Sequence, residues 1–255
     1  MSDALDIARR ELVIANRILA HEDIVDASGH VSVRHPERAD RYLISWSRSP
    51  ELVGLDDIME CSLDGTPVGD GRPPYRERHI HGAIYEVRTD VHAVVHAHAE
   101  AVLPFGIVDV PLRPVIGSAS MIGEHIPVWD IADEFGDATT LLVETFEQGR
   151  SLARALGTDA VALMAAHGMA AAAGSLIEVV RIAVYLARNA RVQLAAMHTG
   201  KPLRYLSRGE LGARAEGAYF SRDSHGIYRG WEYWALRAGC ADLLPERDEK
   251  TLRTV

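Results

Sequence analysis

Hydrophobic and polar residues follow two different periods near the start of this chain. Over residues 3–21, apolar residues recur every three or four positions with Arg and Glu between them, which predicts an amphipathic helix. Ser2 or Asp3 is placed to cap its first turn. Over 25–35 the period falls to two, since Val31 and Val33 alternate with polar residues after a Ser-Gly turn, which predicts a strand.

Short strands and helices are predicted to alternate along the rest of the chain. In order, they are a strand at 42–45, a loop rich in glycine and proline over 64–75, a helix over 76–87, a strand over 91–98, irregular structure with short strands over 111–128, a helix over 137–156, a strand over 160–166, and helices near 175–199 and 207–221. Because strands and helices are interleaved and no linker divides them, we expect residues 1–255 to form a single α/β domain, with a charged tail over about 246–255.

Composition narrows the possible partners and compartment. The net charge of −9 comes without a basic stripe, so no nucleic-acid partner is expected. The two cysteines, Cys61 and Cys240, are far apart in the sequence, which argues against a disulfide framework and favours a reducing cytoplasm. The N-terminus lacks the apolar core of a signal peptide, and no run approaches the roughly 18 apolar residues of a membrane span. We therefore expect a cytoplasmic protein without a membrane partner.

Histidines at the ends of two apolar runs are candidate metal ligands. His96 and His98 are two residues apart at the end of the 91–98 strand, so their side chains should share a face, with Cα atoms about 6–7 Å apart. His167 ends the 160–166 strand, and Glu77 lies upstream. Three imidazoles and a carboxylate are the parts of an open divalent-metal site. In a chain with 12 histidines, spacing alone also allows ordinary core or surface roles, and His92 is interpreted as structural.

The region around these residues resembles the class II aldolase/adducin family. The family pattern of Glu, His four later, Ile-Tyr, Arg-x-Asp and Ala-Val-x-His-x-His falls on Glu77, His81, Ile84-Tyr85, Arg88, Asp90 and Ala93 to His98. Its Ser-Gly-Asn-x-Ser strand matches 28–32, and its apolar-x-x-His-Gly matches His167-Gly168. The resemblance extends over a core of about residues 5–235.

The resemblance implies a fold, an assembly and roles for the site residues. The fold would be a single-domain α/β/α arrangement with a central, mainly antiparallel sheet, assembled as a homotetramer with active sites at subunit interfaces. His96, His98 and His167 would hold a divalent ion (Zn, Mn, Co or Fe), and Glu77 would be the acid/base. His81 would contact the residues that form the site or would be structural. A residue near the C-terminus of a neighbouring subunit would complete each site, and the candidates are Tyr205, Tyr219, His225 and Tyr228.

The chain departs from the family at the positions that bind sugar phosphates. In place of small polar residues it has His30, Arg48, Tyr75 and Arg76, which argues against a sugar-phosphate substrate. Arginine forks suit a carboxylate, and Tyr75 and His30 offer flat surfaces for a ring. These four residues are therefore the candidate substrate-binding set, and the chain resembles the branch of the family that decarboxylates hydroxylated aromatic acids.

The resulting hypothesis is a metal-dependent, non-oxidative decarboxylase of a hydroxylated aromatic (di)carboxylic acid in aromatic catabolism. Its small-molecule substrate would lose CO₂ and leave an enolate-like carbanion that Glu77 protonates. His79 is a second candidate proton donor if the segment after Glu77 is not yet helical. Three alternatives remain: an aldolase acting on a non-phosphorylated hydroxy or keto acid, an Fe-dependent oxygenase, and a non-catalytic scaffold like adducin.

Overall fold

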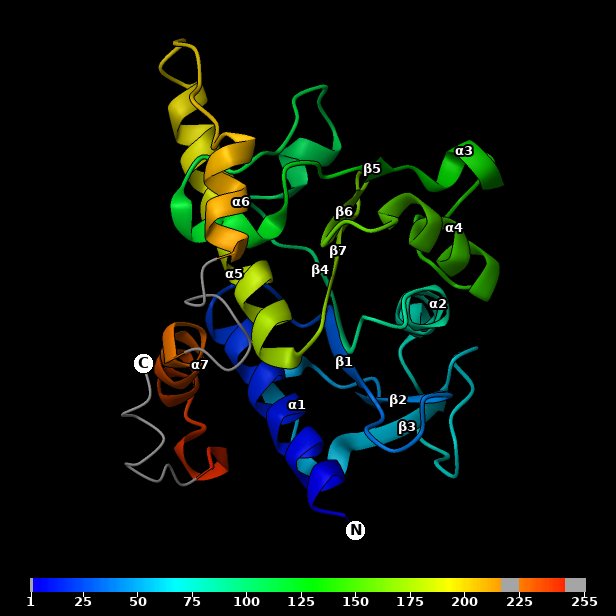
Figure 1. Cartoon of the computed structure of the whole chain (residues 1–255). Helices are drawn as coiled ribbons and strands as arrows, with labels where there is room; N and C mark the ends of the chain where they lie inside the picture. The colour runs from blue at the N-terminus through cyan, green and yellow to red at the C-terminus, as the bar shows by residue number, and fades with distance from the viewer. Residues whose placement is uncertain (1, 217–224, 246–255) are drawn as a thin grey trace.

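A central β-sheet divides the molecule into layers (Figure 1). The computed structural model describes residues 2–216 and 225–245. Within these residues the sheet has seven strands in the order β3-β2-β1-β4-β7-β6-β5. Neighbouring strands are antiparallel except β5 and β6, which are parallel. The strands are β1 (His30–Arg34), β2 (Arg41–Ser45), β3 (Ile58–Ser62), β4 (Ala93–Ala97), β5 (Val128–Trp129), β6 (Val161–Met164) and β7 (Gly168–Ala173).

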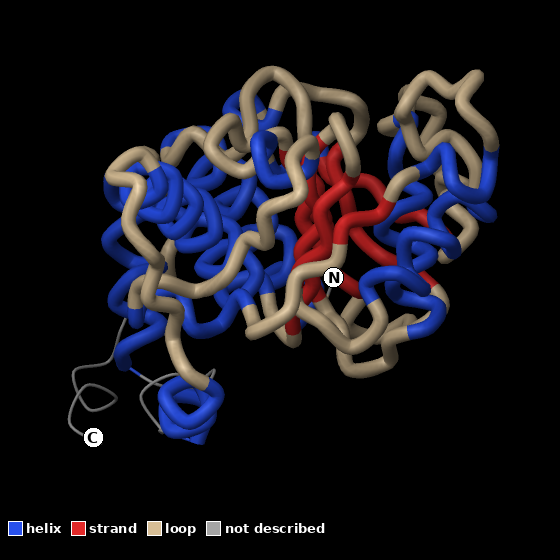
Figure 2. The backbone as a smooth tube through the Cα atoms, turned by 90° about the horizontal axis from the view of Figure 1, so that it is seen from above, coloured by secondary structure: helices blue, strands red, loops and turns tan. Residues whose placement is uncertain are grey.

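Helices cover both faces of this sheet, as the view along its edge shows (Figure 2). On one face lie α1 (Asp3–His21), α5 (Leu176–Met197) and α7 (His225–Arg237), which contact one another. On the other face α2 (His79–Val87) packs against α4 (Phe146–Leu156). Two short helices, α3 (Ile131–Phe135) and α6 (Arg208–Glu216), complete the described set. The expected α/β/α arrangement around a mainly antiparallel sheet is confirmed.

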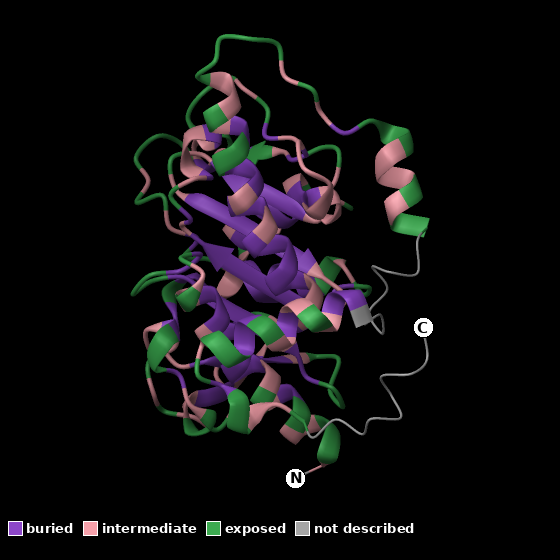
Figure 3. Cartoon of the chain, turned by 90° about the vertical axis from the view of Figure 1, so that its left-hand side faces the viewer, coloured by how far each residue is buried: buried purple, intermediate pink, exposed green. Residues whose placement is uncertain are grey.

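Each face of the sheet has its own hydrophobic core, and the strands between them are almost wholly buried (Figure 3). Helix α1 illustrates why the sequence folds this way. The Ser2 hydroxyl accepts a hydrogen bond from the Leu5 N–H at 3.3 Å and caps the helix, as predicted. The predicted apolar stripe is buried in the core beneath α5, at Ala8, Leu12, Ala15 and Leu19. No helix in the described ranges combines the length and apolar character needed to cross a membrane.

The predicted helix over 137–156 is wrong in its first half, because α4 begins only at Phe146. The Thr139 hydroxyl accepts from the Leu141 N–H at 3.0 Å, and the Thr140 hydroxyl accepts from the next N–H at 3.4 Å. Such local bonds compete with the helical pattern, and Leu141 adopts φ of 65°. The helix starts where Thr145 and Gln148 form a capping box.

Strand predictions were incomplete for a different reason. Neither β3 nor β7 was predicted. In the case of β7, the strand consists largely of alanine and is buried on both sides, so its sequence shows no alternation of apolar and polar residues. The 91–98 strand is shorter than expected, and His98 lies just beyond its end. Of the predicted 207–221 helix, the structure describes 208–216, and the predicted tail over 246–255 lies outside the described residues.

Candidate metal centre

His96 anchors the centre from the middle of the sheet. On β4 it lies opposite His30 of β1 and Ala170 of β7. Its side chain shares the face of Val94, toward the core beneath α2 and α4. The ring Nδ1–H donates to the Met169 carbonyl at 3.1 Å. That bond fixes the tautomer, so the Nε2 lone pair is directed at the other candidate ligands.

His98 brings a second nitrogen to the same point, although it follows the end of β4. Its Nε2 lies 3.0 Å from the Nε2 of His96. Two nitrogens bound at 2.0–2.1 Å to one tetrahedral ion lie about 3.3 Å apart, so this separation is close to that of shared ligation. Burial, and then the neighbouring His96 and His167, lower the pKa of His98 to about 4. The ring is therefore neutral near pH 7 and has a lone pair for a metal.

His167 reaches the cluster from the tight turn between β6 and β7. Met164 pairs with Gly168 across this turn, the His167 N–H donates to the Met164 carbonyl at 3.1 Å, and Ala166 adopts φ of 53°. Gly168 is required here because a Cβ would lie 2.4 Å from the Ala97 carbonyl oxygen. The glycine thus lets β7 pair closely with β4 immediately after His167.

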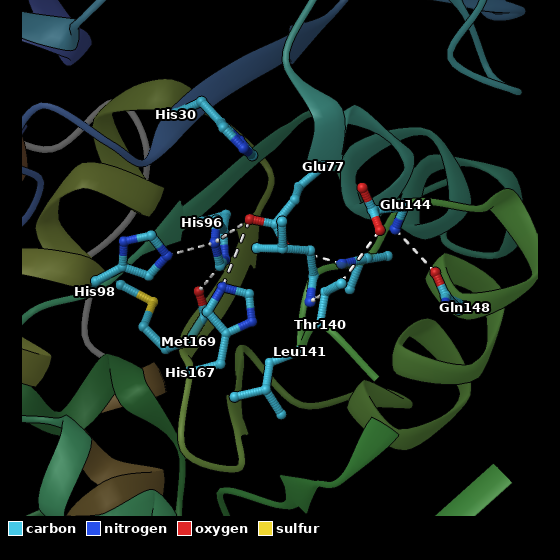
Figure 4. A network of polar contacts seen from close by, with 12 residues as sticks. His30, Glu77, His96, His98, Thr140, Leu141, Glu144, Gln148, His167 and Met169 are labelled. Atoms are coloured by element: carbon cyan, nitrogen blue, oxygen red, sulfur yellow. Dashed lines mark hydrogen bonds and ion pairs between the residues drawn. The ribbon is translucent and has the colours of Figure 1, made fainter. Parts of the chain in front are cut away.

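Glu77 closes the fourth side of the centre (Figure 4). It lies in a single 3₁₀ turn (Arg76–Arg78) before α2, with a non-helical φ/ψ of −88° and 19°. One carboxylate oxygen accepts from the Val143 N–H at 2.9 Å, and the other lies 3.3 Å from His96 Nε2 and 3.5 Å from His167 Nε2. Burial alone would raise the pKa of Glu77, but the contacts with His167 and His96 outweigh it and hold that pKa below its usual value. The carboxylate is therefore ionised.

This donor set fits a divalent metal ion. One ligand atom from each of Glu77, His96, His98 and His167 lies within 4.8 Å of the other three. Among the described residues, neither ring nitrogen of His167 has a hydrogen-bond partner although both are buried, which is unusual unless the partner is a metal. Imidazole nitrogens with one carboxylate suit Zn, Mn, Co or Fe.

A chain of buried hydrogen bonds lies behind the centre, between β1 and α2. His30 Nδ1 is 2.6 Å from His81 Nε2, and His81 Nδ1 is 2.6 Å from the Ser32 hydroxyl. Ser32 is in turn 2.8 Å from the Tyr85 hydroxyl. The sequence singled out His30 and His81 but missed Ser32 and Tyr85 as their partners. Spacing could have indicated them, because Ser32 follows His30 by two residues on the strand and Tyr85 follows His81 by four on the helix, so each pair shares a face.

The predicted substrate-binding residues divide into two groups. His30 and Tyr75 are buried beside the centre, with ring centroids 4.6 Å apart, and the His30 ring is 5.1 Å from that of His96. The Arg76 side chain is 77% exposed and pairs with Glu144 at 3.3 Å.

The guanidinium of Arg48 is likewise held away from the centre. It donates to the Leu52 carbonyl at 2.8 Å and lies 3.4 Å from Asp57, while its backbone carbonyl accepts from the Tyr75 hydroxyl. The structure thus brings the two flat rings to the four-residue centre and holds both predicted guanidiniums on surface acids.

Three of the remaining candidates, His79, Tyr205 and Tyr228, contact other parts of the described protomer. His79 begins α2 with its ring 6.4 Å from that of Phe146. Tyr205 lies under the Arg113 guanidinium at 4.5 Å, and Tyr228 packs against the core of α1, α5 and α7. Tyr219 and the side chain of His225 are outside the described part of the chain.

A cavity of about 630 Å³ opens on the exposed side of His98. That volume suits a small organic substrate. Its wall includes Asp26, Glu51 and Glu100, together with Arg191 from α5. The sequence did not single out Arg191, because nothing in its helical surroundings distinguishes it from a solvated arginine.

Comparisons with known proteins show which proteins this chain resembles in sequence and in fold. The chain is 35% identical over 201 residues to the decarboxylase tropJ of Talaromyces stipitatus, covering 74% of this chain and 76% of that protein. It is 28% identical over 220 residues to a 3,4-dihydroxyphthalate decarboxylase of Arthrobacter keyseri, covering 80% and 84%. The fold matches the crystal structure of an aldolase II superfamily protein from Pseudomonas syringae, with a TM-score of 0.78, 20% identity and coverage of 95% and 96%. The model of the class II aldolase and adducin N-terminal domain matches residues 10–194, and this chain therefore belongs to that family.

Proposed function

We propose that this protein is a divalent-metal-dependent decarboxylase that removes CO₂ from a hydroxylated aromatic carboxylic acid without an oxidant. The observation that carries the proposal is the convergence of three imidazoles on an ionised Glu77 that is anchored to the backbone. Two relatives that match this chain over about three quarters of its length or more are named decarboxylases, and one of them acts on 3,4-dihydroxyphthalate.

Glu77 is the proton-transferring group in this proposal. Glu77 is ionised in the free protein, so it first takes the proton of a substrate hydroxyl. When the bond to the leaving carboxylate breaks, the electron pair stays on the ring carbon, Glu77 gives its proton to that carbon, and the product phenolate is protonated from water. The Val143 N–H holds one carboxylate oxygen, so the oxygen near His96 and His167 is the one that faces the substrate. A bound divalent ion supplies the Lewis acid that offsets the charge left by CO₂.

The substrate would enter through the cavity beside His98, and its ring would reach past His98 toward the rings of His30 and Tyr75, which do not themselves line that cavity. Arg191 lines that cavity and can bind a carboxylate as the protein stands. Arg76 and Arg48 remain in the proposed binding set, but each would first have to leave an acid, Glu144 and Asp57 respectively. His79 remains a candidate second proton donor in this proposal. Because its ring packs against Phe146, it would have to pass the proton through a water molecule.

We also propose a cytoplasmic homotetramer, with active sites completed at subunit interfaces, that serves in aromatic catabolism. Ile107, Val108 and Val128, which are 65%, 50% and 52% exposed, are the apolar side chains that we propose another copy buries. Light scattering with size exclusion measures the assembly directly, and a monomer at micromolar concentration would contradict this part of the proposal.

The function is tested by measuring CO₂ release from 3,4-dihydroxyphthalate and related hydroxylated aromatic acids. Activity should be lost in EDTA, return with Zn²⁺, Mn²⁺ or Co²⁺, and persist without oxygen. An aldehyde product in place of CO₂ would instead identify an aldolase, and a requirement for O₂ would identify an oxygenase. Failure to take up any metal would favour the scaffold.

A further inference from the structure

We propose that His30 donates a hydrogen bond to the substrate through Nε2–H, and that Tyr85, Ser32 and His81 act as positioning residues that fix this tautomer. The inference rests on the proposed function in one respect, namely that a substrate oxygen binds beside the metal ligands. The proton position itself is a property of the folded chain and can be measured without substrate.

The four residues form one continuous chain because of their spacing. His30 and Ser32 are two apart on β1 and share its face toward α2, while His81 and Tyr85 are one turn apart on α2 and face β1. Their contacts are 2.6 Å, 2.6 Å and 2.8 Å from His30 through His81 and Ser32 to Tyr85. All four side chains are buried, so water does not compete for these bonds.

The direction of the bonds is set at the tyrosine end. Among the described residues the Tyr85 hydroxyl has two acceptors within reach, the Ser32 hydroxyl at 2.8 Å and the His92 carbonyl at 3.5 Å. Only the first is a normal O–H···O distance, and a phenol is a better donor than an alcohol. Tyr85 therefore donates to Ser32, and Ser32 donates to His81 Nδ1.

The neutral state of the histidines carries this direction to the active site. His81 and His30 are both buried, and the only hydrogen bonds of their Nδ1 and of His81 Nε2 to described residues are to each other and to the Ser32 hydroxyl, so neither ring has an acid partner to offset a charge and each holds a single proton. Since Nδ1 of His81 accepts from Ser32, the His81 proton is on Nε2 and is donated to His30 Nδ1. Because His30 Nδ1 accepts this hydrogen bond, the one proton of the His30 ring must be on its Nε2.

His30 Nε2–H is placed where a donor is useful. The side chain extends from β1 toward Glu77 and His96 (Figure 4), and the Tyr75 ring packs against it with centroids 4.6 Å apart. No described residue bonds to Nε2, so this N–H is left for a substrate oxygen. A fixed donor in a buried site stabilises developing negative charge without reorganising.

The decisive experiment reads the tautomers by NMR of the zinc-loaded protein with ¹⁵N-labelled histidine. The signals of His30 and His81 are assigned by their loss in His30→Gln and His81→Gln. Long-range ¹H–¹⁵N spectra should show both rings with the proton on Nε2. Tyr85→Phe and Ser32→Ala should each convert His81 to a mixture of tautomers, whereas His21→Gln, at an exposed histidine on the far end of α1, should leave the pattern unchanged. A proton on Nδ1 of His30 in the wild-type protein would overturn the inference, whatever the activity.

Kinetics test the donor role separately. His30→Phe keeps a flat ring without the N–H and should lower kcat about 10²- to 10³-fold, with KM changed far less. His30→Gln retains an N–H at the position of Nε2 and should keep kcat within about tenfold of wild type. Equal losses in both variants, at equal zinc content, would overturn the donor role. If the wild-type protein shows the expected tautomer but releases no CO₂, the proposed function fails and the tautomer assignment stands.

Discussion

Replacing Gly168 with alanine should disturb both the sheet and the metal centre. The added Cβ would lie 2.4 Å from the Ala97 carbonyl oxygen and 2.9 Å from Cδ2 of His98. The carbonyl belongs to β4, between two strands, and cannot rotate away without breaking the β4–β7 pairing. The two strands must therefore separate by at least about 1 Å to reach an ordinary contact of about 3.4 Å.

Both stability and metal affinity should fall as a result. Forcing an extra carbon into a packed core costs about 1–3 kcal/mol, and the upper half of that range applies because the obstacle is backbone. His167 directly precedes Gly168, so a shift of about 1 Å at a bond of about 2.1 Å should weaken metal binding at least about tenfold. Urea unfolding of the metal-free protein measures the first effect, and zinc competition with a chromogenic chelator measures the second.

A matched control separates this steric effect from the general effect of losing a glycine. Gly71 lies in a loop, has no atom within 4 Å of a built Cβ and does not need a positive φ, so Gly71→Ala should leave both quantities within experimental error. If Gly168→Ala retains wild-type zinc affinity and loses less than about 0.5 kcal/mol of stability, then the close approach of β7 to β4 does not position His167, and our account of the centre is wrong.

Three further predictions concern the acid/base, the folding of β1 and a buried thiol. Glu77→Gln keeps an acceptor for the Val143 N–H but cannot transfer a proton. The kcat for CO₂ release should therefore fall about 10²- to 10⁴-fold while bound metal is retained. Unchanged turnover would show that Glu77 has no part in the mechanism. Arg34→Met should cost about 3–5 kcal/mol in urea unfolding because the buried guanidinium donates to four backbone carbonyls, and a loss below about 1 kcal/mol would contradict this. Burial raises the pKa of the Cys61 thiol to about 11 from a usual 9, so the contribution of this thiol to stability is complete below pH 9 and is lost as the pH rises from 9 to 11. The free energy of unfolding of Cys61→Ala should therefore fall less over that interval than that of the wild type. Equal falls in the two proteins would refute the assignment.

The sequence was most informative where residues that can bind a metal stand at the end of an apolar run with the period of a strand. His96 and His98 end an apolar run whose parity places them on one face, and His167 precedes a glycine, so three candidate ligands could be named from the strands, and the family resemblance then implied their role. The family pattern then supplied Glu77. None of these steps required knowing how distant segments pack.

Contacts between distant segments were not predictable. The Val143 N–H that holds Glu77 lies in a stretch expected to be helical, and the bonds of Thr139 and Thr140 that prevent the helix become evident only in the structure. Similarly, the pairing of His81 with His30 depends on α2 crossing β1, which no spacing within either segment encodes. Packing between distant segments therefore determines both the bond that holds Glu77 and the contact between His81 and His30.

The two predicted arginines illustrate a further limit and its functional meaning. Guanidiniums on long flexible stems can point in many directions, and the partners that hold them, Glu144 and Asp57, are separated from Arg76 and Arg48 in the sequence. By contrast, His96 and Glu77 each have one atom bonded to the backbone. Groups of the first kind can exchange partners when a substrate arrives, whereas groups of the second kind cannot move without moving the sheet. We therefore expect the rigid centre to set the reaction type, and the substrate preference to depend on whether arginines such as Arg76 and Arg48 leave Glu144 and Asp57.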